Sequence, residues 1–212
     1  MSRLPASARR QQLLDVAAEL FSEQGYARAT TAQLAKQAGV TEPIIYRHFK
    51  SKRALFVALI ERTGEQTLAQ WEADLRGRSD PADRLAALIG DNPMVSVEGR
   101  AAYRVFLQAI SEADDEEIHA ALEAHIRKVH AFIRRELEAA QGAGRVTAHY
   151  SAEVMAWLMI HMGLGYGAVS AMSVRGHGTD EHGTHVADVL ARVLVGRGAA
   201  SPQAGGNGGG GG

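Results

Sequence analysis

The residues best suited to chemistry lie in the short run TEPIIYRHF, which follows the tripeptide AGV. Glu42 is a carboxylate that could accept a hydrogen bond from the amino group of a cytosine. Pro43 and Ile44 could pack on thymine methyl groups, while Arg47 could donate to a guanine or clamp a phosphate. His48 suits a phosphate contact. This mixture predicts a surface that meets the bases and the backbone of duplex DNA.

Two short helices are needed to present that surface. Thr30 is expected to begin the first as its N-cap, with Gln33 completing a capping box, and Gly39 ends it. Thr41 is expected to cap the second, which ends near Phe49. Glycine turns the corner between them without strain. The pair predicts a helix-turn-helix unit, whose second helix enters a major groove about 12 Å wide.

Helical periodicity continues through the rest of the chain, without sustained strand-like alternation. We therefore expect an all-α protein of about nine helices. The longer helices are expected over 6–24, 51–75, 81–89, 97–110, 114–141, 151–172 and 184–195, with Ser51 and Ser151 as the N-caps of two of them. We predict a helix-turn-helix DNA-binding domain over 1–52 and a helical effector-binding and dimerisation domain over 53–203. A disordered glycine-rich tail over 204–212 is expected to follow.

Composition narrows the functional classes. The 212 residues include no cysteine, which excludes disulfides, thiolate metal sites and cysteine nucleophiles. The net charge of −1 conceals a basic segment, because residues 1–60 hold nine Lys and Arg but only four Asp and Glu. A basic segment on an acidic remainder indicates that only the first part meets a polyanion. The first residues do not have the pattern of a signal peptide, so a cytoplasmic location is expected.

Aromatic and histidine side chains in the second part are candidates for a ligand pocket. With Met155, Met159 and Met162, they would suit a flat or apolar molecule that carries a few polar atoms. The alternative is that they simply fill a helical core. The candidate pocket residues are Trp71, Tyr103, Phe106, His125, Trp157, His161 and Tyr166.

A second cluster of polar residues, within RGHGTDEHGTH, raises the possibility of metal chemistry. His177, His182 and His185, with the carboxylates Asp180 and Glu181, are of types that bind zinc. The alternative is a polar glycine-rich loop, which is our expectation. No nucleophile with a base at motif spacing, phosphate loop or dinucleotide fingerprint is present. We expect no catalytic residues, no metal, no cofactor and no enzymatic activity.

The segment from LLDVAAELFSEQGY through ATTAQLAKQAGVTEPIIYRHFKSKRALFVALI resembles the DNA-binding domain of the TetR family of bacterial transcriptional regulators. The resemblance covers roughly residues 8–60. It implies that Thr31, Thr41, Tyr46 and Lys52 contact DNA phosphates. Hydroxyls and a lysine near helix N-termini suit that role. Capping alone is the alternative for the two threonines, and burial of the ring is the alternative for Tyr46.

The apolar stretch 154–172 has two possible explanations. It approaches the minimum length for spanning a bilayer, but His161, Ser170 and three glycines weaken that interpretation. The interpretation we adopt is a helix packed on its own subunit and on a partner, with no membrane contact. Together with the 184–195 helix it would form a four-helix dimer interface, which the family resemblance also implies.

These observations predict a ligand-responsive transcriptional regulator, most plainly a repressor. It would bind palindromic double-stranded operator DNA as a homodimer and be released by a small hydrophobic or aromatic effector. The alternatives are a DNA-binding regulator without a small-molecule switch, and a metal sensor or metal-dependent helical protein that uses His177, His182 and His185.

Overall fold

The structure is a computed structural model that describes residues 4–90 and 99–195, apart from the side chains of 99–103 and 195. The described residues form nine α-helices and no strand, which confirms the all-α prediction. The helices are α1 (Ala6–Gln24), α2 (Thr31–Gln37), α3 (Glu42–His48), α4 (Lys52–Asp74), α5 (Pro81–Gly90), α6 (Gly99–Ser111), α7 (Glu116–Gly142), α8 (Ala152–Ala171) and α9 (Val186–Val195).

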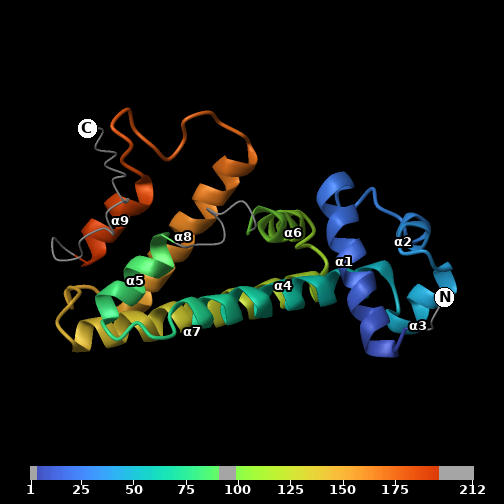
Figure 1. Cartoon of the computed structure of the whole chain (residues 1–212), viewed down its shortest axis with the longest axis horizontal. Helices are drawn as coiled ribbons and strands as arrows, with labels where there is room; N and C mark the ends of the chain where they lie inside the picture. Colours follow the sequence, from blue (N-terminus) through green and yellow to red (C-terminus); the bar gives the residue numbers. More distant parts are fainter. Residues whose placement is uncertain (1–3, 91–98, 196–212) are drawn as a thin grey trace, which may run out of the picture.

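The molecule is elongated along two long helices, α4 and α7, which pack side by side (Figure 1). Helices α1 to α3 lie at one end, α5, α8 and α9 lie at the other, and α6 lies between them. Arg53 joins the first turns of the long pair, with ion pairs of 3.0 Å to Asp115 and 2.7 Å to Glu117. The two helices therefore start at the same end of the molecule.

Two separate hydrophobic clusters hold the helices. The first lies beneath α1 to α3 and includes Leu55, Phe56, Leu59 and Ile60 of α4 together with residues of α6 and the start of α7. The second includes Trp71 from the far part of α4 and residues of α5, α7, α8 and α9. The first cluster thus extends beyond the proposed division at residue 52, and α4 contributes to both.

Side chains predicted from the sequence to cap helices do so at several positions. Thr30 and Gln33 form the predicted capping box of α2, and Ser51 and Ser151 accept from the backbone at the starts of α4 and α8. Thr41 occupies the N-cap position of α3, but its side chain makes no capping hydrogen bond. The acidic run before α7 also caps, because Asp115 accepts from the backbone N–H groups of two following residues.

The start of α9 differs from the prediction, because the helix begins at Val186 rather than near Thr184. His185 acts as the N-cap residue: its Nδ1 accepts from the Ala187 N–H at 3.1 Å, and the Asp188 carboxylate accepts from the His185 N–H at 3.0 Å. This reciprocal arrangement is a capping box built with imidazole in place of a hydroxyl. Sequence patterns for N-caps name Ser, Thr, Asp and Asn, so they pointed to the nearby threonine.

Helix α8 is long and apolar enough to cross a membrane by length and composition, a test that core helices of soluble proteins also pass. One of its faces packs in the second cluster, and its other face leaves large apolar side chains exposed. Helix α9 also exposes apolar side chains. The exposed apolar residues of the two helices are Val154, Leu158, Val169, Val186, Val189 and Val193.

Two sequence-based expectations fall outside the described residues. They are the disordered state of the 204–212 tail and the position of the Tyr103 side chain.

A buried ion pair fastens α5 to α7. The Arg84 guanidinium donates to both carboxylate oxygens of Glu136, at 2.6 and 2.9 Å, and also to the backbone oxygen of Leu75 at 2.9 Å. Glu136 is only 4% exposed. Burial by itself raises the pKa of this carboxyl, but the hydrogen bonds and charges of Arg84 and then of Arg135 outweigh burial and lower the pKa below its ordinary value.

Replacing Arg84 should destabilise the fold strongly, because the Arg84→Met variant leaves the buried Glu136 carboxylate with only the exposed Arg135 guanidinium, 3.2 Å away, as its partner. We expect the free energy of unfolding, measured by urea denaturation at pH 7, to fall by about 3–5 kcal/mol. The double variant Arg84→Met, Glu136→Leu should recover most of that loss, because no unpaired charge stays buried. Equal destabilisation of the single and double variants would contradict this explanation.

A buried histidine links α4, α6 and α7. His125 is 7% exposed, and its ring stacks on Phe106 with centroids 4.3 Å apart. It also lies directly over Gly64, where a β-carbon would collide with the imidazole. Burial, and secondarily the charge of Lys128, lower the pKa of His125 to about 4. The ring is therefore neutral in the folded protein at neutral pH.

Acid should weaken the fold through this histidine. In the unfolded chain an ordinary histidine binds a proton below about pH 6.5, whereas folded His125 stays neutral down to about pH 4. The free energy of unfolding should therefore fall by about 3 kcal/mol between these two pH values from this group alone. Denaturation of His125→Asn across that range should lack this component, and His149→Asn, at an exposed site, should retain it.

Candidate nucleic-acid interface and interior cavity

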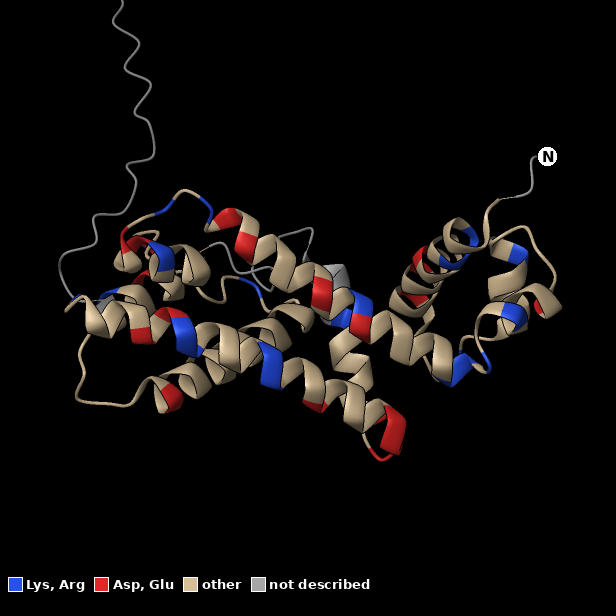
Figure 2. Ribbon diagram, turned by 90° about the horizontal axis from the view of Figure 1, so that it is seen from below, with Lys and Arg blue, Asp and Glu red and all other residues tan. Residues whose placement is uncertain are grey.

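Helices α2 and α3 form a helix-turn-helix unit that exposes one side of α3. Leu34, Ala35 and Ile45 form its buried back, and Gly39 turns the chain with a φ of +65°. In the left-handed region a glycine has no β-carbon to strain. Figure 2 shows Lys and Arg segments on the helices at this end of the molecule and an acidic start of α7.

The α3 residues predicted to contact DNA lie at or near the surface. Pro43, Tyr46 and Arg47 are exposed, and Tyr46 has half of its surface accessible. Thr41 is also exposed, whereas Thr31, Glu42, Ile44 and His48 are partly buried. No described segment of this chain covers the exposed side chains. The structure therefore leaves α3 accessible to a duplex, and the individual contacts stay predictions.

Three of these residues are bonded to one another. The Thr31 hydroxyl donates to a carboxylate oxygen of Glu42 at 2.5 Å, and its oxygen lies 3.2 Å from the Tyr46 hydroxyl. Because Thr31 has a single hydroxyl proton and gives it to Glu42, Tyr46 must be the donor to Thr31. Both hydroxyl protons are thus used inside the protein. A phosphate could accept from Thr31 or Tyr46 only after this chain of hydrogen bonds rearranges, and Glu42 has to find another donor.

Lys52, for which the resemblance implies a phosphate contact, makes its hydrogen bonds within the protein in this structure. Its ammonium donates to the backbone oxygens of Tyr26 at 2.9 Å, Ala29 at 3.0 Å and Ala27 at 3.4 Å. It also lies over the Tyr26 ring, 4.4 Å from the centroid. An ammonium group has three donors, and all three are used. In this structure Lys52 fixes the loop between α1 and α2 to the start of α4, and a direct phosphate contact would have to replace one of these bonds.

A surface depression extends the exposed side of α3 toward the start of α1. Arg9, Thr41, Ile44, Arg47 and His48 line it together with the turn after α2. The neighbouring Arg10 instead lies over the Phe49 ring. The depression therefore brings two guanidiniums and an imidazole to one place.

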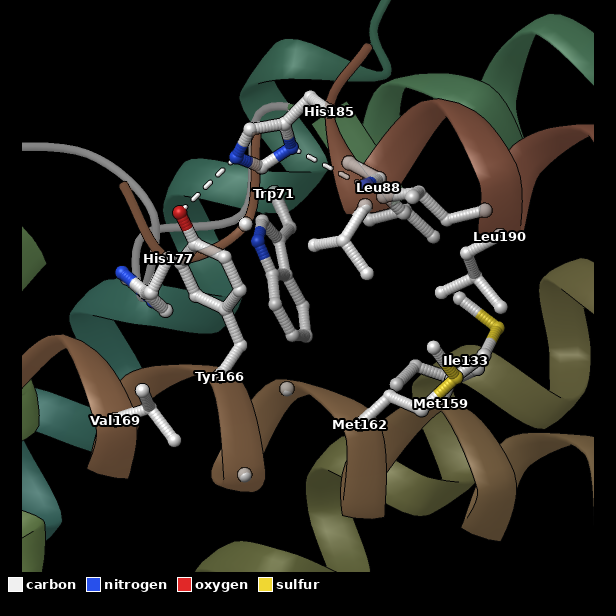
Figure 3. A pocket seen from close by; sticks show the side chains of 16 residues that line it. Trp71, Leu88, Ile133, Met159, Met162, Tyr166, Val169, His177, His185 and Leu190 are labelled. Atoms are coloured by element: carbon white, nitrogen blue, oxygen red, sulfur yellow. Dashed lines mark hydrogen bonds between the residues drawn. The ribbon is translucent and has the colours of Figure 1, made fainter. Parts of the chain in front are cut away.

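A cavity of about 310 Å³ lies within the second cluster, at the other end of α4 (Figure 3). Two of the predicted pocket residues, Trp71 and Tyr166, line it, as do the predicted Met159 and Met162. Most of the wall is apolar, and its polar groups gather where Tyr166, His177 and His185 meet. The other lining residues include Leu88, Ile89, Ile133, Val169, Val186, Ala187 and Leu190.

The other predicted pocket residues do not line this cavity. Phe106 and His125 stack on each other between α6 and α7, and His125 borders a separate depression beside Glu61 and Lys128. Trp157 packs against His130, and His161 lies on its other side, 6.1 Å away between ring centroids. The residue types indicated a pocket with aromatic side chains in this half of the chain. Helical periodicity, however, does not tell which face of α8 is turned inward, because nearly every position of that helix is apolar.

The histidine-rich segment contributes two side chains, His177 and His185, to the cavity wall. The Tyr166 hydroxyl lies 3.0 Å from His185 Nε2, and the Ser170 hydroxyl lies 3.1 Å from His177 Nε2. The side chain of His182 is 79% exposed and lies away from both. Within 4–90 and 99–195 no group of three potential metal ligands comes together. No recognised sequence motif links His177 and His185 to Tyr166. Sequence reasoning therefore did not find their place in the cavity wall.

Comparison with known protein families gives a match in the first part of the chain. Residues 13–59 match the sequence profile described as bacterial regulatory proteins, tetR family. This segment of the chain carries a TetR-family domain. Residues of α1 to α4 account for that match, which places the exposed α3 in the family's DNA-binding domain.

The chain is similar to a curated protein over part of its sequence and to solved structures over most of its fold. The HTH-type transcriptional activator FasR of Mycolicibacterium smegmatis is 38% identical over 88 residues, which cover 42% of this chain and 40% of FasR. The match thus spans about two fifths of the curated relative. Two solved structures share the fold over 88% of this chain at lower identity. One is a transcriptional regulator from Saccharomonospora viridis in complex with choline, with a TM-score of 0.74, 20% identity and 93% of that chain covered. The other is FadR from Bacillus subtilis in complex with stearoyl-CoA, with a TM-score of 0.73, 18% identity and 98% of that chain covered.

Removing the Lys52 ammonium should loosen the start of α4. We expect Lys52→Met to lower the free energy of unfolding by about 1.5–3 kcal/mol, because three backbone oxygens lose a charged donor. Urea denaturation measures this change. Lys50→Met, at an exposed neighbouring position, is the matched control and should lie within about 0.5 kcal/mol of the wild type. A Lys52 variant as stable as the control would leave phosphate contact as the remaining role of this residue.

Proposed function

We propose that this chain, with its TetR-family domain, is a ligand-responsive transcriptional regulator, most plainly a repressor, that binds palindromic operator DNA as a homodimer. A small effector would release it from the operator. The observation that carries the proposal is the accessibility of α3, with Pro43, Tyr46 and Arg47 exposed on one side of a helix-turn-helix unit. Residues on that side supply the hydrogen-bond and apolar groups that base edges require.

Dimerisation rests on the opposite end of the molecule. The apolar side chains that α8 and α9 leave exposed, among them Val154, Leu158, Val189 and Val193, suit burial against a second copy. A dimer would place two α3 helices so that they read half-sites about 34–36 Å apart, one helical turn of DNA. The pairing of two chains is what makes a palindromic operator the natural target.

Effector control rests on the cavity and on α4. Lys52 at the start of α4 holds the helix-turn-helix end, and Trp71, nineteen positions on, lines the cavity. At 1.5 Å per residue the two positions are about 28 Å apart on a single helix. A ligand that shifts Trp71 would shift the start of α4 and hence the spacing of the two α3 helices. The cavity favours this proposal over a regulator without a small-molecule switch.

The function is tested by selecting binding sites from a pool of random duplexes and measuring affinity by fluorescence anisotropy. We expect the wild type to select a two-fold symmetric site. Arg47→Ala should weaken binding to that site by roughly fivefold or more, and weaken binding to a scrambled duplex less, because a base contact contributes about 1–3 kcal/mol of discrimination. Arg127→Ala, a 73% exposed side chain on α7, should leave both affinities unchanged.

The proposed function is refuted if the selection enriches no sequence and the wild type binds the selected and scrambled duplexes with equal affinity. An equal loss on both duplexes in Arg47→Ala would instead assign Arg47 to a phosphate.

A further inference from the structure

A buried hydrogen-bond donor faces the cavity without a protein acceptor. Trp71 is 4% exposed, and its indole Nε1 has no hydrogen-bond partner among the described residues. An indole nitrogen can only donate, and leaving a buried donor unpaired costs on the order of 1–3 kcal/mol. Because Trp71 lines the cavity, an acceptor on a molecule within the cavity would satisfy this donor. Figure 3 shows the indole nitrogen on the side of the ring that faces Tyr166.

A second donor is made available by the capping box of α9. His185 Nδ1 accepts from the Ala187 N–H, so it carries no proton, and the neutral ring must carry its proton on Nε2. That Nε2–H donates to the Tyr166 hydroxyl oxygen, 3.0 Å away, as Figure 3 shows. The hydroxyl proton of Tyr166 is therefore not used by His185. It can be given to a ligand beside Trp71.

The remaining wall sets the charge and size of the occupant. The described residues that line the cavity include no Lys, Arg, Asp or Glu, and the capping hydrogen bond leaves His185 Nδ1 as an acceptor. An ionised carboxylate would lose its hydration there without gaining a cation, which is costly. Met159, Met162, Ile133 and Leu190 offer an apolar surface on the other side. A volume of about 310 Å³ corresponds to roughly ten water molecules, and hence to on the order of ten non-hydrogen atoms.

We propose that the cavity takes an uncharged, mainly apolar carbonyl compound of this size. The carbonyl oxygen accepts from Trp71 Nε1 and the Tyr166 hydroxyl, and the hydrocarbon part lies against the methionines and Leu190. This inference rests on the proposed function, because it specifies the chemical class of the effector.

Three probes of matched size test the carbonyl. Nonan-2-one has a neutral acceptor, nonanoate has a charged one, and n-propylbenzene has the same number of carbons and no oxygen. We expect titration calorimetry of the full chain at pH 7.5 to show nonan-2-one binding at least fivefold more tightly than either of the others. Tighter binding of nonanoate would overturn the assignment of an uncharged ligand. No detectable binding of the ketone would overturn the proposal as a whole.

Two variants then separate hydrogen bonding from shape. Trp71→Phe and Tyr166→Phe each remove one donor and keep an aromatic ring, so each should weaken nonan-2-one binding by about twofold to tenfold and leave n-propylbenzene within twofold. Trp157→Phe, whose ring packs on His130 away from the cavity, is the matched control and should change neither affinity. An equal loss for both probes would show that the residues only shape the wall and would overturn the paired-donor assignment.

The effector proposal and the proposed function fail in different measurements. Ligand affinity is measured without DNA, and operator affinity is measured without ligand. If the wild type selects an operator but does not distinguish the ketone from n-propylbenzene, the proposed effector class is wrong and the regulator stands. If the ketone binds as expected but no operator is selected, the proposed function is wrong while the chemistry of the cavity holds. Release of a selected operator by nonan-2-one, lost in Trp71→Phe, would support both.

Discussion

The continuity of α4 is the constraint on which the rest of the structure depends. One uninterrupted helix, Lys52–Asp74, contributes side chains to both hydrophobic clusters. Its first turn is fixed to the loop before α2 by the Lys52 ammonium, and its far part places Trp71 against the cavity. Because a helix transmits displacement along its axis with little internal change, the two ends cannot move independently. The parallel α7 stiffens this connection, since Arg53 joins the starts of both helices.

The interior is polar at only a few places, and each of them joins different helices. Arg84 and Glu136 fasten α5 to α7, and His125 stays uncharged between α6 and Gly64 of α4. Such groups are tolerated when every hydrogen bond is made or when the charged form is suppressed. Trp71 Nε1 and Arg62 Nε depart from that pattern, since neither has a hydrogen-bond partner among the described residues. Of these two, Trp71 lines the cavity, which is why its donor points to a ligand there.

Local signals in the sequence predicted the elements well and the cavity poorly. The capping box of Thr30 and the caps Ser51 and Ser151 depend on residues within one turn, and the structure confirms them. The cavity depends on which faces of distant helices meet, and α8 carries apolar residues around its whole circumference, so its periodicity could not assign an inner face. Trp71 and Tyr166 were correctly included, whereas Trp157 of the same helix as Tyr166 lies elsewhere.

His185 is shared between two functions of the fold. Its imidazole begins α9, the helix whose outer side exposes Val189 and Val193, and it also sets the direction of the Tyr166 hydrogen bond at the cavity wall. A replacement that cannot accept from the Ala187 N–H removes the cap of the helix proposed to meet a second copy, and it alters the cavity wall as well. Evolution of a new effector through residue 185 would therefore alter assembly in the same step, and neutral routes to a new specificity should run through the apolar wall instead.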